Sequence, residues 1–222
     1  MVLNEDLKKY GEIGKIISIF QEINKIPRNS GNELAIVKYL ENFAQKRNLR
    51  VYTDAHNNVI IKKLATNGQY DNYIAFQSHT DMVCEKLPDS NHDFINDPID
   101  LFIKDDYILS NETNIGADNG IGVAYMLAML DSSDIKHPNL EMIFTAEEET
   151  SMNGAKNIDL SQIESNRIIS LDAFSENVII YGCASNLSRV LCFSGSQCDI
   201  PELKNKKTYS LNIDGFQRRT FW

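Results

Sequence analysis

Apolar residues recur along the chain with two different periods, and these periods predict most of its secondary structure. Spacings of three to four residues predict amphipathic helices, and short runs of β-branched and aromatic residues predict strands. The predicted helices cover residues 7–26, 32–47 and 121–130, of which the last is apolar almost throughout and therefore buried. Strands are predicted at 50–53, 59–62, 73–77, 140–145, 167–171 and 178–183, with a hairpin at 100–104 and 107–110. This mixture of helices and strands is typical of an α/β fold.

Residues that can bind a metal ion follow three of the predicted strands directly, and a loop connects a fourth strand to one more. These residues are His79 with Asp81, Asp118, Glu147 to Glu149, and Asp172. In open α/β sheets, sites are built at the carboxyl ends of the strands. Taken singly, each group has a simpler interpretation, such as a polar strand end or a solvated acidic turn. Their repetition at equivalent positions favours one shared metal site.

Asp118 lies in the glycine-rich stretch 114–122, which leads into the buried helix. Three glycines within seven positions allow backbone conformations that are closed to other residues, and they let another group approach closely. A helix that begins here would direct its first N–H groups and the positive end of its dipole at whatever lies above Asp118. The simpler alternative is that Asp118 caps the helix.

The chemical types of the candidate ligands indicate the metal. One imidazole with several carboxylates and no thiolate suits zinc, with manganese or cobalt as substitutes. His79 and Asp81 are two residues apart and therefore lie on one face of a strand, so the carboxylate can hold the imidazole or a neighbouring ligand. Since the carboxylates outnumber what one zinc ion needs, we expect two metal ions with one acid bridging them.

Composition limits the class of protein and its partners. The 222 residues carry a formal net charge of −9, which argues against nucleic acid or an acidic membrane surface as a partner. The amino terminus has no apolar core of signal-peptide length, and no stretch reaches about 18 apolar residues, which predicts a cytoplasmic protein. The four cysteines have no C-x-x-C spacing, so we expect free thiols rather than a zinc ribbon or a disulfide framework.

Four motifs together resemble the aminoacyl-histidine dipeptidases. They are HTDMV at 79–83, GADNGIG at 116–122, the Glu148-Glu149 pair followed by NGA at 153–155, and YGCA at 181–184. These enzymes are also called Xaa-His or cytosol non-specific dipeptidases, and they form a branch of the two-zinc carboxypeptidase and aminoacylase superfamily. The resemblance extends from about residue 13 to residue 216. The combination of motifs is specific, although each motif alone is not.

The resemblance implies a doubly wound, mostly parallel α/β catalytic domain with helices on both faces, interrupted by a smaller lid domain that also forms the dimer. In this chain the catalytic domain would occupy residues 1–186, and residues 187–222 would begin the lid domain. The implied activity is metal-dependent hydrolysis of dipeptides, with Xaa-His among the substrates. A related aminopeptidase or deacylase of the same superfamily is an alternative, because it differs only in substrate.

The resemblance also implies a role for each candidate residue. The residues that would bind zinc are His79, Asp118, Glu149 and Asp172. The first zinc ion would take all of these except Glu149, and Asp118 would bridge to a second ion that Glu149 also binds. Glu148 would be the general base that takes a proton from the attacking water, while Asp81 would orient His79.

Several positions depart from the family pattern. They are Ser151 in place of a glycine after the acidic pair, Ala173-Phe174 in place of Ser-Glu, and Ser185-Asn186 in place of Gly-Gly. Family members are also far longer, and they take their last zinc ligand, a histidine, from near the carboxyl terminus. We therefore expect at most one tightly bound zinc ion per chain and slow or absent hydrolysis. An inactive remnant that binds a single metal ion is the alternative.

The last residues, 217–222, differ from the Gly-Gly-His-Ser-Gly that family members have at this place. Residues 218–222 can be encoded by AGG AGG ACA TTC TGG, and advancing the frame by one base turns these codons into GGA GGA CAT TCT GGN, which encode Gly-Gly-His-Ser-Gly. We therefore expect a frameshift near the codon for Gln217 that truncated a longer gene, which reading the gene tests. A genuine short protein with an unrelated basic and aromatic tail is the alternative.

Overall fold

The structure is a computed structural model, and it describes residues 7–66, 68, 72–105, 107–173, 175 and 178–182. The chain divides into two compact units, Met1–Phe174 and Ser175–Trp222. All helices and strands of the described residues belong to the first unit. The predicted beginning of a lid domain at 187–222, with the carboxyl-terminal tail, lies outside the described residues. The domain boundary at residue 186 therefore stays a prediction.

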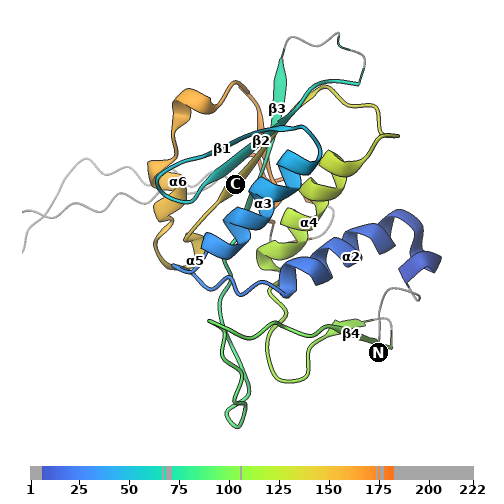
Figure 1. Ribbon diagram of the computed structural model, residues 1–222, viewed down its shortest axis with the longest axis vertical. Helices are drawn as coiled ribbons and strands as arrows, with labels where there is room; N and C mark the ends of the chain where they lie inside the picture. Colours follow the sequence, from blue (N-terminus) through green and yellow to red (C-terminus); the bar gives the residue numbers. More distant parts are fainter. Residues whose placement is uncertain are drawn as a thin grey trace, which may run out of the picture. The chain divides into compact units, whose positions relative to one another are not determined.

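A five-stranded mixed sheet forms the centre of the first unit (Figure 1). Its strands are β1 (Arg50–Thr53), β2 (Val59–Lys63), β3 (Tyr73–His79), β6 (Asn139–Thr145) and β7 (Ile168–Ser170), in the spatial order β1-β2-β6-β3-β7. Strands β6, β3 and β7 are parallel, while β1 and β2 form an antiparallel hairpin beside β6. The three parallel strands therefore end at the same edge of the sheet.

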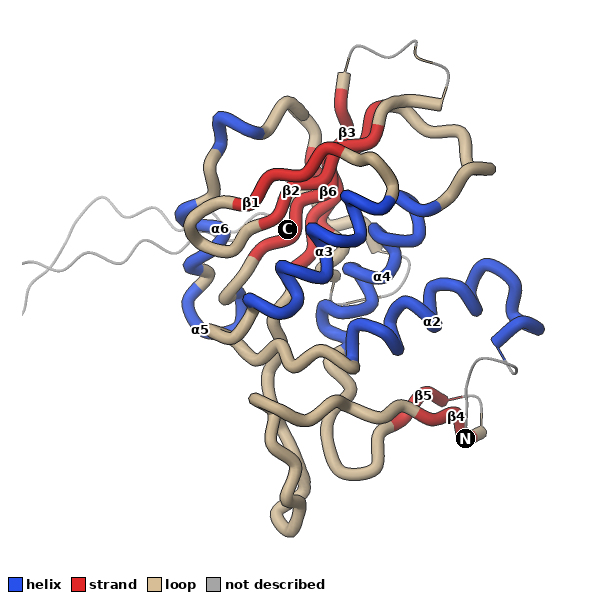
Figure 2. Tube along the Cα trace, viewed as in Figure 1, coloured by secondary structure: helices blue, strands red, loops and turns tan. Residues whose placement is uncertain are grey.

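Three long helices lie on one side of this sheet (Figure 2), and their apolar side chains build the core together with it. They are α2 (Gly11–Asn24), α3 (Leu34–Lys46) and α4 (Ala117–Asp131). Helix α3 packs against β1 and β2, α4 packs against β3, and α2 packs against α4. The predicted buried helix is confirmed in α4, whose buried side chains include Val123, Met126 and Leu127. No helix among the described residues is long and apolar enough to cross a membrane.

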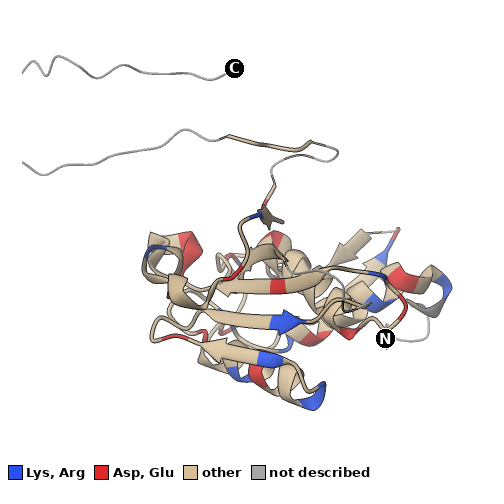
Figure 3. Cartoon of the chain, turned by 90° about the horizontal axis from the view of Figure 1, so that it is seen from above, with Lys and Arg blue, Asp and Glu red and all other residues tan. Residues whose placement is uncertain are grey.

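The two faces of the sheet follow from the alternation of side chains along each strand. Met142 and Phe144 of β6 belong to the core beneath the helices, whereas Glu141 points to the opposite face. There, Glu141 accepts backbone N–H groups of residues 164 and 165, so the segment that follows η2 (Leu160–Gln162) covers this face. Figure 3 shows the strands as mostly uncharged, with charged residues as isolated segments. The predicted α/β class is confirmed.

The connection from β3 to α4 contains a second sheet of two strands. These strands are β4 (Phe102–Lys104) and β5 (Tyr107–Leu109), which confirm the predicted hairpin. The prediction of a strand at 178–183 is wrong, because residues 178–182 form no strand. Residue 183 lies outside the described residues. The β-prone side chains of this segment gave the signal, but a strand also requires a neighbour with which to pair.

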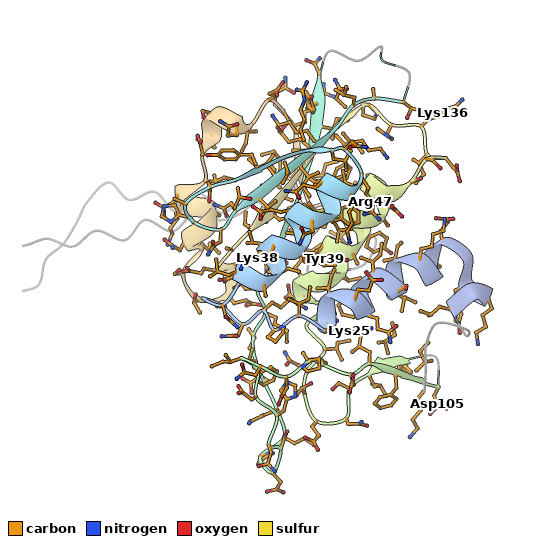
Figure 4. All side chains as sticks on the ribbon, viewed as in Figure 1. Lys25, Lys38, Tyr39, Arg47, Asp105 and Lys136 are labelled. Carbon is orange, nitrogen blue, oxygen red and sulfur yellow. The ribbon has the colours of Figure 1, made fainter. Side chains whose placement is uncertain are left out.

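An exposed ion pair joins the ends of α3 and α4. Arg47, which is labelled in Figure 4, places its Nε atom 2.6 Å from Asp131 Oδ1, and its guanidinium lies 3.6 Å from the centre of the Phe43 ring. Exposed pairs of this kind contribute at most about 1 kcal/mol to stability. The apolar packing of both helices against the sheet therefore dominates the energetics of this region.

Candidate metal centre

The candidate site lies at the edge where the parallel strands end. His79 is the last residue of β3, the acidic pair follows β6 and opens the short helix α5 (Glu148–Ser151), and Asp172 follows β7. The ligand atoms meet in two groups, in each of which all atoms lie within 4.8 Å of one another: His79 with Asp118 and Asp172, and His79 with Glu148 and Glu149. His79 belongs to both groups, so one imidazole joins all of the predicted ligands.

The imidazole of His79 is buried and held from both sides. Its Nδ1 atom lies 3.0 Å from the backbone carbonyl oxygen of Asp81 and 3.4 Å from Asp81 Oδ1, while Nε2 lies 3.0 Å from Asp118 Oδ1. Burial alone would lower the pKa of His79, but hydrogen bonds to Asp81 and Asp118 outweigh it and raise the pKa to about 9. The surrounding carboxylates therefore stabilise a positive charge at this place.

Asp81 is fully buried, and its carboxylate connects β3 to the turn after β6. Its Oδ1 atom accepts the backbone N–H of Glu148 at 3.0 Å, and its Oδ2 atom accepts the N–H of Glu149 at 3.2 Å and the Ser30 hydroxyl at 2.7 Å. Burial would raise the pKa of Asp81, but the hydrogen bonds from His79, Ser30 and these N–H groups lower it. Asp81 therefore stays an anion beside the imidazole.

The acidic turn after β6 gathers negative charge next to His79. Glu147 has a left-handed backbone (φ 51°) and belongs to neither ligand group. Burial is the largest cause that raises the pKa of Glu148 and of Glu149, and repulsion between the site's carboxylates adds to it, whereas His79 acts in the opposite direction. Carboxylates held together in this way are stabilised by a cation.

Asp118 reaches the site from an irregular start of α4. Gly116 precedes it in the left-handed region (φ 59°), the Asp118–Asn119 peptide is cis, and both of these residues have non-helical backbone angles. The alternative interpretation of Asp118 as a helix cap is wrong, because its carboxylate contacts the imidazole of His79 instead of a backbone N–H group of α4. Regular helical geometry begins only after Asn119, so the helix does not start at Asp118 itself.

Sequence reasoning missed two buried charged residues in the loop between α2 and α3. Residues 28–31 gave only the signal of a turn, yet Arg28 is 2% exposed and Glu33 is 1% exposed. Glu33 Oε1 accepts the backbone N–H groups of Gly31 at 2.8 Å and of Glu147 at 3.2 Å. A buried arginine in a loop follows no periodicity. The one signal came from the glycines of stretch 114–122, which predicted that another group lies close to the backbone there.

The donor set fits a divalent metal ion. One imidazole with carboxylates suits zinc, manganese or cobalt, and the hydrogen bond from Nδ1 to Asp81 leaves Nε2 of His79 facing the carboxylates, as in metal-binding imidazoles. Cys84 is a free thiol outside both ligand groups, and the other three cysteines lie outside the described residues. The described residues therefore offer nitrogen and oxygen ligands to a metal.

Comparisons with known proteins give relatives that are peptidases. The chain is 35% identical over 170 residues to the cytosol non-specific dipeptidase of Escherichia coli K12, a match that covers 76% of the chain and 35% of that protein. The aminoacylhistidine dipeptidase of Vibrio alginolyticus superposes with a TM-score of 0.70 at 35% identity, over 72% of the chain and 33% of that structure. Aminopeptidase PepT of Bacillus cereus superposes with a TM-score of 0.61 at 27% identity, over 72% of the chain and 43% of that structure. No family model matches the chain.

The sheet, its covering helices and the candidate ligands at the strand ends define a catalytic domain of the metallopeptidase class. Within that class, the chain is related to the aminoacyl-histidine dipeptidases, and the resemblance drawn from its motifs is confirmed. The chain spans about a third of the length of these relatives. The relationship of the chain to these enzymes implies a metal cofactor.

Proposed function

We propose that the chain binds zinc at this site and hydrolyses the peptide bond of dipeptides, Xaa-His among them. The observation that carries the proposal is the convergence of His79, Asp118 and Asp172, whose ligand atoms lie within 4.8 Å of one another. Three protein ligands leave a zinc ion with an open position for chemistry. The names of the two dipeptidase relatives support the substrate class. Manganese or cobalt would suit the same ligands.

The proposal gives each residue a separate task. His79, Asp118 and Asp172 would hold the first metal ion, and Asp118 and Glu149 would hold a second. A zinc ion supplies Lewis-acid chemistry, because it lowers the pKa of a water and polarises a carbonyl group. Asp81 fixes the imidazole of His79 and, through two backbone N–H groups, the turn that carries the acidic pair.

Glu148 acts as the general base of the proposed reaction. Its carboxylate lies in a ligand group with His79, and its pKa is raised by burial and by neighbouring carboxylates. A raised pKa makes a carboxylate a better proton acceptor, so Glu148 can take a proton from the attacking water and return it to the leaving amino group. The backbone N–H of Glu148 is fixed by Asp81, which limits where this carboxylate can lie.

Hydrolysis of longer peptides is a second candidate. The structural similarity to a tripeptidase of Staphylococcus aureus favours it, since that structure superposes with a TM-score of 0.61 at 26% identity over the same 72% of the chain as the dipeptidase does. The described site contains the metal ligands common to both proposals and leaves the substrate length open. Parallel assays of dipeptides and tripeptides therefore distinguish the two candidates.

The proposal also includes a cytoplasmic location and a small peptide, rather than nucleic acid or a membrane, as partner. The formal net charge of −9 argues against nucleic acid or an acidic membrane surface as the partner. Dimerisation through a lid domain concerns residues 187–222, which lie outside the described part of the chain.

The test compares two adjacent acids in the zinc-loaded 222-residue chain. We expect slow hydrolysis of an Xaa-His dipeptide that Glu148→Gln abolishes without loss of bound zinc. Glu147→Gln is the matched control, because Glu147 belongs to neither ligand group, and we expect it to keep the activity. Equal turnover in Glu148→Gln and the wild type would contradict the role of Glu148. A zinc-loaded wild type without turnover would contradict hydrolysis by this chain and favour the inactive single-metal alternative.

A further inference from the structure

The guanidinium of Arg28 connects two segments that carry candidate ligands. Its Nη1 atom donates to the carbonyl oxygens of Thr80 at 3.1 Å and of Asp81 at 3.4 Å, and its Nη2 atom donates to the carbonyl oxygen of Gly116 at 2.6 Å. Thr80 and Asp81 directly follow His79, and Gly116 lies two residues before Asp118. Because the guanidinium is planar and rigid, it fixes the separation of these carbonyl groups.

The glycines of stretch 114–122 leave the space that Arg28 fills. A Cβ atom added at Gly120 would lie 2.6 Å from Arg28 Nη2, and one added at Gly116 would also be too close to the same atom. The close approach that the glycine pattern predicted is therefore an approach by a side chain of the same protein. Arg28 comes from a loop 88 positions away in sequence from Gly116.

Arg28 keeps its charge although it is buried. Burial lowers the pKa of Arg28 to about 10, while the carboxylate of Asp81 acts in the opposite direction. The side chain is therefore protonated at neutral pH. Apolar side chains fill buried positions without the desolvation penalty of a charge, so a buried guanidinium indicates that directed hydrogen bonds are needed here.

The same loop also reaches the third ligand-bearing segment. Ser30 donates its hydroxyl to Asp81, and Glu33 accepts the backbone N–H of Glu147, which precedes the acidic pair. The loop that joins α2 to α3 thus contacts the segments after β3, before α4 and after β6. Arg28 is the member of this loop that bridges the first two.

From these contacts we propose that Arg28 is a positioning residue that sets the distance between His79 and Asp118 and thereby prepares the metal site. It touches neither the metal ligands' donor atoms nor the reacting groups, and it acts through the backbone of the segments that carry them. The inference rests on the proposed function, since it concerns the same metal centre. Its test therefore has one arm that does not require metal.

The first arm measures backbone hydrogen exchange in the metal-free 222-residue chain. We expect Arg28→Met to accelerate exchange at least about tenfold in the peptides that cover residues 79–83 and 114–120, because both segments lose their shared partner. Leu40→Ala is the control, since Leu40 is fully buried in α3 and tests general destabilisation. Equal acceleration in the two variants, or none in Arg28→Met, would overturn the proposal.

The second arm measures zinc affinity by competition with a coloured chelator. We expect Arg28→Met to bind zinc about 10–100-fold more weakly, as for partners that orient metal ligands, and Leu40→Ala to bind like the wild type. Arg28→Lys keeps the positive charge but replaces the planar guanidinium by a single ammonium group, so we expect an intermediate loss of zinc affinity. This variant also provides the test if Arg28→Met does not fold. Wild-type affinity in both Arg28 variants would overturn the proposal. A wild type that binds no zinc would contradict the proposed function, while the hydrogen-exchange measurement would still test the role of Arg28.

Discussion

The carboxylate of Asp81 accepts a hydrogen bond from the backbone N–H of Glu148, with 3.0 Å between Oδ1 and the nitrogen. Asp81 follows β3 and Glu148 follows β6, so this bond joins the ends of two adjacent parallel strands. The same carboxylate lies 3.4 Å from Nδ1 of His79. The order of the strands in the sheet thereby determines how far the imidazole lies from the acidic pair.

This relationship predicts the effect of removing one acceptor from Asp81. The Asp81→Asn variant replaces an oxygen by an amide group that cannot accept a hydrogen bond, so the turn at 148–149 or the hydroxyl of Ser30 loses its partner. We expect zinc affinity to fall about 10–100-fold. The matched control is Asp159→Asn, because Asp159 accepts bonds from Ser161 and Tyr52 outside the site. Equal affinities of the two variants for zinc would contradict the assigned role.

Substitutions at two glycines distinguish the cost of backbone strain from the cost of steric crowding by Arg28. Gly11 and Gly116 have nearly the same positive φ, 56° and 59°, but a Cβ atom at Gly11 would meet nothing within 4 Å. We expect Gly11→Ala to lower the free energy of unfolding by about 1–2 kcal/mol. Gly116→Ala should cost about 1–3 kcal/mol more, because its methyl group collides with Arg28 and Met82. Urea denaturation of both variants measures the difference, and equal losses would show that Arg28 exerts no steric constraint.

The buried carboxylate of Glu141 predicts how stability depends on pH. Burial would raise its pKa, but hydrogen bonds from Ser165, the backbone of residue 164 and Lys62 outweigh burial and lower it. A carboxylate with a lowered pKa binds fewer protons in the folded state than in the unfolded state, so its contribution is complete above its unfolded pKa of about 4.3. That contribution is lost as the pH falls through the lower pKa of the folded state.

Acid titration of the unfolding free energy checks this prediction. We expect the wild type to lose stability below about pH 4.3 more steeply than the Glu141→Gln variant, which cannot titrate at this position. At pH 7 the variant should be the less stable protein, since its neutral amide cannot form an ion pair with the Lys62 ammonium that lies 3.1 Å from Glu141. Parallel curves for the two proteins between pH 3 and pH 7 would contradict the lowered pKa of Glu141.

Much of the fold was predictable from the sequence because its periodic signals are strong. The apolar run at 121–130 gave α4, and the β-prone runs that precede His79 and Glu147 gave the parallel strands β3 and β6. Parallel strands bring their carboxyl ends to one edge, so residues that follow them are expected to meet. The structure places the predicted ligands in two groups around His79.

The supporting residues were not predictable, because their roles depend on contacts between distant segments. Arg28 sits in a stretch whose local chemistry indicates only a turn, and its partners lie 52 to 88 positions away. Glu33 resembles any acid at the start of a helix, yet its buried carboxylate accepts the backbone N–H of Glu147. The irregular start of α4 also escaped prediction, because glycine permits several backbone conformations and the sequence does not select one.

The central claim is that His79 is a ligand in a metal site, and the zinc content of the purified chain tests this claim most directly. Elemental analysis after dialysis should find one zinc ion per wild-type chain, because the proposed first position has three protein ligands within 4.8 Å of one another. The proposed second position would have only Asp118 and Glu149 among the described residues. His79→Gln should retain almost none, whereas His56→Gln, which alters an exposed histidine, should retain one. Two zinc ions in the wild type, or undiminished zinc in His79→Gln, would contradict this account.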